Sequence, residues 1–121
     1  MADEISISFD ISMEDSNGEV IQTWSPDEFL RDIGAEIYVD EILDIGTSEE
    51  TLSFGDIATK GEVVLYNRDA TNYVSWGFTT GQLKGKLNPG KFAFFTMDNS
   101  GDLIVQANNA ACKVKFIAYA N

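Results

Sequence analysis

The stretch from Gly61 to Gly77, GEVVLYNRDATNYVSWG, constrains the fold of this chain more than any other. An apolar run at 63–66 ends in a polar corner at 67–72, and a second β-type run follows at 73–76. Asn and Asp favour such corners because their side chains bond nearby backbone amides. Two β-type runs on either side of the corner predict a β-hairpin at the centre of a sheet.

Short strands separated by turn residues are expected along the rest of the chain. Residues 5–13, ISISFDISM, alternate apolar and polar side chains, which predicts a strand with one buried face and one wet face. Asn17-Gly18 predicts a tight turn into a returning strand over 20–24. Further strands are predicted at 36–45, 52–54, 91–97, 103–107 and 112–119, with loops at 46–50 and 78–86 and turns at 88–90 and 98–102.

One segment carries helix signals. Ser25 suits a helix cap, Pro26 suits the first helical position, and Glu28 completes a capping box. These residues predict one or two helical turns ending at Gly34, with a loop as the alternative. Over 36–45 a strand is favoured, although Ile42 and Ile45 also fit helical spacing.

About eight strands at this spacing indicate an all-β fold. The chain has 121 residues, of which 44% are hydrophobic and 12% aromatic, so it is long and apolar enough to bury a core. No repeat or linker divides it. We therefore predict one domain over residues 1–121, a β-sandwich of jelly-roll-like type.

The charge is unevenly distributed. Residues 1–60 carry 16 Asp/Glu and 2 Lys/Arg, a net of −14, whereas residues 61–121 carry 4 and 6, a net of +2. An acidic half repels phosphate, so neither nucleic acid nor an anionic membrane is an expected partner. The acidity serves either solubility or contact with a basic surface. The start of the chain, MADE, lacks the features of a signal peptide, so synthesis in the cytoplasm is expected.

The residues that most often carry catalysis are missing. The chain has no His and a single Cys, so zinc, copper and His-activated nucleophiles are excluded by composition. Cys112 falls on an alternating strand, where a small core residue is expected rather than a nucleophile. The turn at 98–102 resembles a calcium loop, but its glycine comes one position too early for an EF-hand. Neither enzyme activity nor any cofactor or metal is predicted.

Aromatic residues on strands raise the question of an interface. Aromatic residues at strand spacing are more often core, but a group of them is a candidate stacking platform for a sugar or base: Trp24, Trp76, Tyr73, Phe78, Phe92, Phe94 and Phe95. Phe94 and Phe95 are adjacent, so they must point to opposite faces of any strand. Strands that are apolar on both faces indicate a protein–protein interface in so small a sandwich.

The turns and strands together resemble a type of small structural protein of tailed bacteriophages. The resemblance covers roughly residues 40–120 and rests on the following elements: Ile45-Gly46-Thr47, Leu52, Gly55-Asp56, Gly61, Asn67-x-Asp69-x-Thr71-Asn72-Tyr73-Val74-x-x-Gly77, Leu87-x-Pro89-Gly90-x-Phe92 and the strand from Ala107 to Tyr119. It implies a multicopy β-sandwich component of the virion, in the head, neck or tail, without enzyme activity or cofactor.

Two classes of function follow from these expectations. The first is a structural virion subunit, such as a head-decoration or neck/tail protein, that binds capsid or tail subunits and forms a homo-oligomer. The second is a monomeric module that binds a carbohydrate or a receptor. The corner at 67–72 is expected to be structural, with contact to a neighbouring subunit as the alternative. The candidate interface residues are Asn67, Asp69, Asn72, Tyr73, Trp76 and Phe95.

Overall fold

The computed structural model describes residues 4–32 and 36–121, all of them in strands, turns or irregular segments. Its contacts divide the chain into two units, residues 1–34 and residues 35–121. We call the described part of the first unit, residues 4–32, the arm, and residues 36–121 the sandwich. We predicted one domain over residues 1–121, and the contacts separate two compact units within that range.

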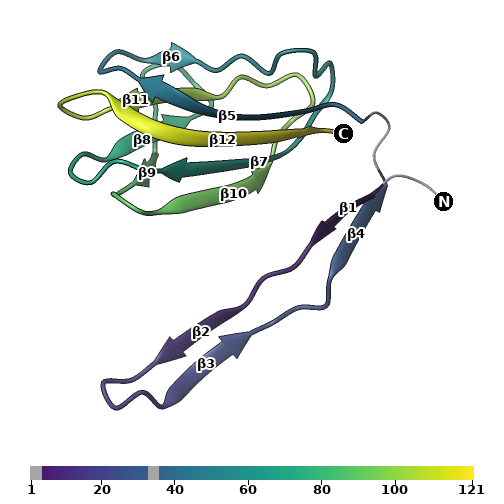
Figure 1. The fold of residues 1–121 in the computed structure, drawn as a ribbon, viewed down its shortest axis with the longest axis vertical. Coiled ribbons are helices and arrows are strands. Elements are labelled where there is room, and N and C mark those ends of the chain that lie inside the picture. Colours follow the sequence, from purple (N-terminus) through teal and green to yellow (C-terminus); the bar gives the residue numbers. More distant parts are fainter. Residues whose placement is uncertain (1–3, 33–35) are drawn as a thin grey trace. The chain divides into compact units, whose positions relative to one another are not determined.

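The arm is a long antiparallel ribbon of two chain segments (Figure 1). Its strands are β1 (Glu4–Ile7), β2 (Ile11–Glu14), β3 (Val20–Trp24) and β4 (Phe29–Asp32). β2 pairs with β3 and β1 with β4, and irregular residues separate the two short ladders. At the tip, Gly18 has a φ of 83°, and the Asp15 carboxylate accepts hydrogen bonds from the backbone amides of Asn17 and Glu19. The predicted Asn17-Gly18 hairpin turn is confirmed.

Two predictions about the arm are wrong. The segment predicted as a helix is irregular at 25–28 and a strand at 29–32, because Phe29 and Leu30 pair with Ile7 and Ser6 across the ribbon. Glu28, expected to cap a helix, accepts a hydrogen bond from the Ser6 hydroxyl instead. The alternation over 5–13 does produce strands, but no described residue of the arm is buried.

The sandwich contains two four-stranded sheets, with strand orders β10-β7-β12-β5 and β6-β11-β8-β9. The strands of the first sheet are β5 (Tyr38–Ile45), β7 (Lys60–Asn67), β10 (Phe92–Thr96) and β12 (Cys112–Ala120). Those of the second are β6 (Glu50–Thr51), β8 (Val74–Gly77), β9 (Gly85–Leu87) and β11 (Ile104–Ala107). All pairings are antiparallel. The all-β sandwich prediction is confirmed, while the jelly-roll detail stays a prediction.

The core lies between the two sheets and takes side chains from both. Strand β12 shows the predicted alternation, with Cys112, Val114, Phe116 and Ala118 buried. The ring of Phe116 meets that of Phe54 edge to face, 5.2 Å between centroids. Other members of the core are Ile45, Leu52, Ile57, Val63, Leu65, Val74, Leu87, Met97, Leu103, Val105 and Ala107. Leu52 and Phe54, predicted on a strand, are buried in an irregular segment instead.

The predicted hairpin over 61–77 is wrong in its pairing, although both of its strands exist. β7 pairs with β10 and β12, whereas β8 pairs with β9 and β11 in the other sheet. The corner at 67–72 therefore carries the chain from one sheet to the other. The turn at 88–90 is confirmed, with Gly90 at a φ of 77° and the amide of Lys91 donating to the carbonyl of Asn88. The segment predicted as a loop at 78–86 runs into β9.

Across the described residues, no helix has the length and apolar character needed to cross a membrane.

Candidate interaction surfaces

The corner at 67–72 is organised around the buried side chain of Asn67. Its amide Nδ2 donates to the carbonyl oxygens of Asn72 and Leu87, at 2.9 Å each, and its Oδ1 accepts from the amide of Asp69. Its backbone amide and carbonyl are also bonded, to Lys91 and Gly90. Asn67 is completely buried, so it ties β7, the corner and β9 together rather than offering a surface.

Asp69 completes this corner from the solvent side. Its Oδ2 accepts hydrogen bonds from the amides of Asn72, at 2.6 Å, and Thr71, at 2.9 Å. The bond from Asn72, followed by the bond from Thr71, lowers the pKa of the Asp69 carboxyl below its ordinary value of 3.8. The arrangement supports the structural interpretation of the corner.

Trp76 and Phe95, two of the candidate interface residues, pack toward each other across the sandwich. Their rings are stacked, with centroids 4.8 Å apart and planes 2° from parallel, and Phe78 meets both rings edge to face. Gly85, opposite Trp76 in the β8–β9 ladder, leaves room for the indole: a Cβ there would lie 2.2 Å from Cε2 of Trp76. Both aromatic residues are half-buried against the core, while Phe78 is exposed beside them.

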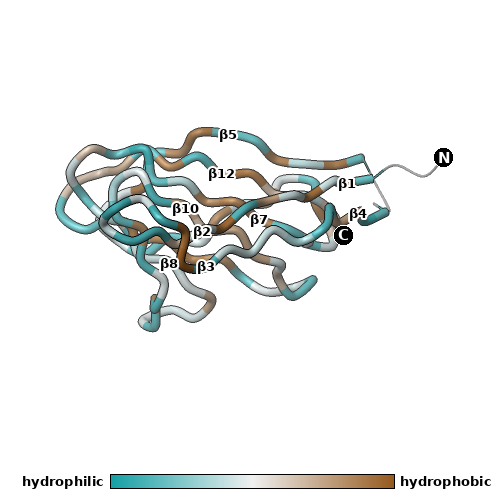
Figure 2. Tube along the Cα trace, turned by 90° about the horizontal axis from the view of Figure 1, so that it is seen from below, coloured by the Kyte–Doolittle hydropathy of each residue, from teal (hydrophilic) through white to brown (hydrophobic). Residues whose placement is uncertain are grey.

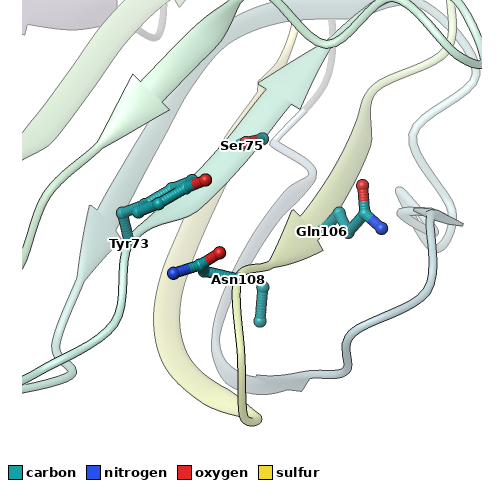
Figure 3. Close-up of a pocket in the computed structure, with 5 residues that line it drawn as sticks. Tyr73, Ser75, Gln106 and Asn108 are labelled. Atoms are coloured by element: carbon teal, nitrogen blue, oxygen red, sulfur yellow. The ribbon is translucent and has the colours of Figure 1, made fainter.

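Tyr73 lines a polar hollow on the second sheet. The hollow has a volume of about 240 Å³ and is formed by Tyr73, Ser75, Gln106, Ala107 and Asn108. Figure 3 shows the side chains of these residues around it. The Gln106 amide donates to the carbonyl of Thr47, and the Lys86 ammonium lies 4.3 Å from the centroid of the Tyr73 ring. Its lining offers hydroxyl and amide groups for a small polar ligand, without a charged group among them.

The outer face of the first sheet is apolar, in contrast to the polar face around that hollow. Residues that pair directly in an antiparallel ladder share a face of the sheet. Phe92, Tyr66, Lys115 and Ile42 therefore form one row across all four strands. Phe94, Val64, Ile117 and Asp40 form the next. We call this surface the outer apolar face; its exposed members are Tyr38, Ile42, Tyr66, Phe92 and Phe94.

None of these five residues is among the six candidate interface residues predicted from the sequence, although Phe92 and Phe94 belong to the predicted stacking platform. Phe94 and Phe95 do point to opposite faces, as predicted, but Phe95 is the one that packs inward. The signal that was available is the two-sided apolar character of β10 and β7, whose outward members are Phe92, Phe94 and Tyr66. Local sequence does not say which member of each adjacent pair faces outward.

The arm carries the other exposed apolar surface. Figure 2 shows hydrophobic residues recurring along the arm as they do along β5 and β12 of the sandwich. Phe9 meets Trp24 edge to face, 5.0 Å between centroids, yet Trp24 remains 51% exposed. The exposed large hydrophobic residues of the arm are Phe9, Ile11, Met13, Val20, Ile21, Trp24, Phe29 and Leu30.

The titratable groups of the described residues form no metal-binding cluster. Cys112 is buried, and desolvation, followed by the charge of Asp69, raises the pKa of its thiol above the ordinary value of 9.0. In the turn at 98–102, Asp98 accepts hydrogen bonds from the amide and the hydroxyl of Ser100, which lower the pKa of its carboxyl. The turn uses this carboxylate for its own backbone, as a β-turn does.

No known protein family, curated protein or solved structure matches this chain. The resemblance to phage structural proteins therefore depends on the pattern of turns and strands alone.

Proposed function

We propose that this chain is a structural assembly protein that works by binding other polypeptides through its arm and its outer apolar face. The observation that carries the proposal is the arm: eight of its large hydrophobic side chains are at least 37% exposed, and none of its described residues is buried. An isolated two-stranded ribbon is marginally stable in water, because it cannot bury enough apolar surface to offset its ordering. A protein partner would supply that burial.

Within this class we propose a multicopy virion component of a tailed bacteriophage, a head-decoration or neck/tail subunit. Support comes from the resemblance of residues 40–120 and from the compact sandwich, whose corners are fixed by internal hydrogen bonds. The expected partners are capsid or tail subunits and further copies of this chain. Its expected location is the assembled particle, after synthesis in the host cytoplasm.

The experiment that tests the virion role is a quantitative protein analysis of purified phage particles, followed by labelling of the chain in electron micrographs. The proposal expects many copies per particle at one position in the head, neck or tail. Attachment should weaken as salt rises from about 0.05 to about 0.5 M, because exposed charge pairs are screened over the Debye length. Particles that lack the chain would contradict a virion role.

A monomeric binding module is the second candidate, and the polar hollow beside Tyr73 is the observation in its favour. Tyrosine with neighbouring hydroxyl and amide groups is suited to a sugar. Under this alternative, glycan binding should be lost in Tyr73→Ala, while the chain stays monomeric at every concentration. The assembly proposal expects Tyr73→Ala to leave association unchanged.

A further inference from the structure

We infer that the arm of one copy of this chain packs on the outer apolar face of a second copy. This inference rests on the proposed assembly function and names its partner surface. The contact joins two surfaces that the fold leaves exposed, the ribbon of residues 4–32 and the outward side of the sheet β10-β7-β12-β5.

The arm is apolar on both of its faces, so it needs cover beyond its own side chains. Ile11 pairs with Trp24, so these two residues share one face of the ribbon. Ile21 neighbours Gln22, the partner of Met13, so it lies on the opposite face of the same ladder. In the other ladder Phe29 pairs with Ile7 and Leu30 with Ser6, so Phe29 and Leu30 lie on opposite faces there. A ribbon of this kind is suited to lying in contact with another protein surface rather than standing in water.

Length argues that this surface belongs to another copy. Each side of the ribbon has about 14 residues and spans about 45 Å, at about 3.3 Å per residue. Strand β12, with 9 residues the longest strand of the sheet, spans about 30 Å by the same rise. A sheet of this length covers only about two thirds of the arm, so its own sheet alone would leave apolar side chains of the arm exposed, and a second copy is needed to cover the remainder.

The charges of the two surfaces favour packing of an arm on the sheet over packing of an arm on another arm. Residues 1–34 carry nine acidic residues and one basic residue, a net of −8, so two arms repel each other. On the outer apolar face, Lys113 and Lys115 pair with Asp44 and Asp40, and Arg68 and Lys91 lie at the ends of β7 and β10. With the buried Glu62 also on this face, opposite Thr96, the apolar surface is close to neutral, and the cations at its margin suit an acidic arm.

The surface area buried is sufficient for a stable contact when the arm of each copy packs on the sheet of another copy and each sheet is covered by one arm. A ribbon about 10 Å wide that overlaps the roughly 30 Å length of the sheet covers about 300 Å² on one face. Giving and receiving an arm therefore covers about 600 Å² per copy, at the lower end of the range for specific protein interfaces. A symmetric dimer and a closed ring both satisfy this condition.

Cross-linking of the full-length chain tests the contact and its direction. One variant carries Gln22→Cys on the arm and a second carries Thr96→Cys on the outer apolar face; the native Cys112 is buried. Mixing the two and adding a short bis-maleimide should give a heterodimer. The matched control replaces Thr96→Cys by Thr80→Cys, on the exposed loop before β9, and should give no comparable product.

A doubly substituted chain separates contact within one copy from contact between copies. With Gln22→Cys and Thr96→Cys in the same molecule, the inference expects covalent dimers and larger species at a concentration at which the native chain self-associates. A cross-linked monomer would overturn it, because the arm would then cover its own sheet.

Sedimentation velocity separates failure of this inference from failure of the assembly proposal. Trp24→Ser on the arm and Phe92→Glu on the face should each weaken self-association at least about tenfold, as loss of a buried aromatic anchor does. Thr80→Glu, with the same charge change as Phe92→Glu, should change it less than about twofold. Oligomers indifferent to both Trp24→Ser and Phe92→Glu would overturn the arm contact and leave assembly standing. A native chain that stays monomeric up to millimolar concentration would overturn the arm contact and remove self-association from the proposed function.

Discussion

The arm and the sandwich are built from similar short antiparallel strands, yet they bury their apolar residues very differently. In the sandwich, Val63, Leu65 and Phe116 are fully buried between two sheets. In the arm, Ile11, Met13 and Trp24 occupy equally regular positions and are about half exposed. Alternation along a strand therefore defines an apolar face, and only the number of layers decides whether that face is covered within the chain. The arm has one layer, so the ribbon by itself leaves these side chains exposed.

The largest expected effect distinguishes a core aromatic from an arm aromatic. Phe116→Ala should lower the free energy of unfolding of the sandwich by about 3–5 kcal/mol, because it removes a fully buried ring and leaves a cavity. Trp24→Ala should change the same quantity by less than about 0.5 kcal/mol. Urea unfolding of the dilute chain, followed by the circular dichroism of the strands, measures both. Equal losses of unfolding free energy in the two variants would contradict the claim that only the sandwich buries its aromatic residues.

The next effect concerns the corner that joins the two sheets. Asn67→Ala removes two donated hydrogen bonds and one accepted bond from a buried site, so it should cost about 2–3 kcal/mol. Asn108→Ala, an exposed Asn of the same unit, is the matched control and should cost less than about 0.5 kcal/mol. The urea midpoints of unfolding of the two variants measure both stability losses. A neutral Asn67→Ala would mean that backbone pairing alone holds the corner.

These residues also show how much the sequence predicts. The β-type runs at 63–66 and 73–76 and the polar corner between them follow from the local sequence pattern, but the placement of their strands, β7 and β8, in different sheets does not. Asn67 uses its side chain to reach Leu87, 20 residues later, and such a long-range bond leaves no local signal. Over 25–32 the capping pattern was outweighed by the pairing of Phe29 with Ile7, 22 residues earlier.

The exposed apolar face follows from the two-sided apolar strands, but the residues that form it do not; that this face is an interface stays a prediction. The choice between Phe94 and Phe95, however, depends on which neighbour each meets across the sandwich. Phe95 packs inward because Trp76 stacks on it, and Trp76 can do so because residue 85 is Gly. That relation between three strands exists only in the folded chain.

A smaller effect is expected at this stack. Gly85→Ala places a Cβ against the indole of Trp76, which must shift away from Phe95 at a cost of about 1–3 kcal/mol. Tryptophan emission should change together with the stability. Gly46→Ala serves as control, because a Cβ at position 46 would meet nothing within 4 Å. Unaltered emission and stability in Gly85→Ala would show that the stack is loose.

The smallest effect is a dependence of the sandwich on acid pH. The hydrogen bonds from Asn72 and Thr71 keep the pKa of Asp69 below 3.8 in the folded chain. A lowered folded pKa stabilises the native state above the unfolded pKa, and this stabilisation is lost as pH falls through the folded pKa, below about pH 4. Asp69→Asn should flatten the acid limb of the melting temperature measured between about pH 6 and about pH 3. An acid limb identical to that of the native chain would assign the loss to other carboxylates, such as Asp98.

Backbone hydrogen exchange, read by mass spectrometry as a function of chain concentration, tests the central claim most directly. In dilute solution the account predicts fast exchange over residues 4–32 and strong protection of β7 and β12, because only the sandwich buries its strands. As concentration rises into the range of self-association, residues 4–32 and the edge strands β5 and β10 of the outer apolar face should gain protection together. Strong protection of the arm in the dilute monomer, or an arm that stays unprotected in the oligomer, would contradict the account.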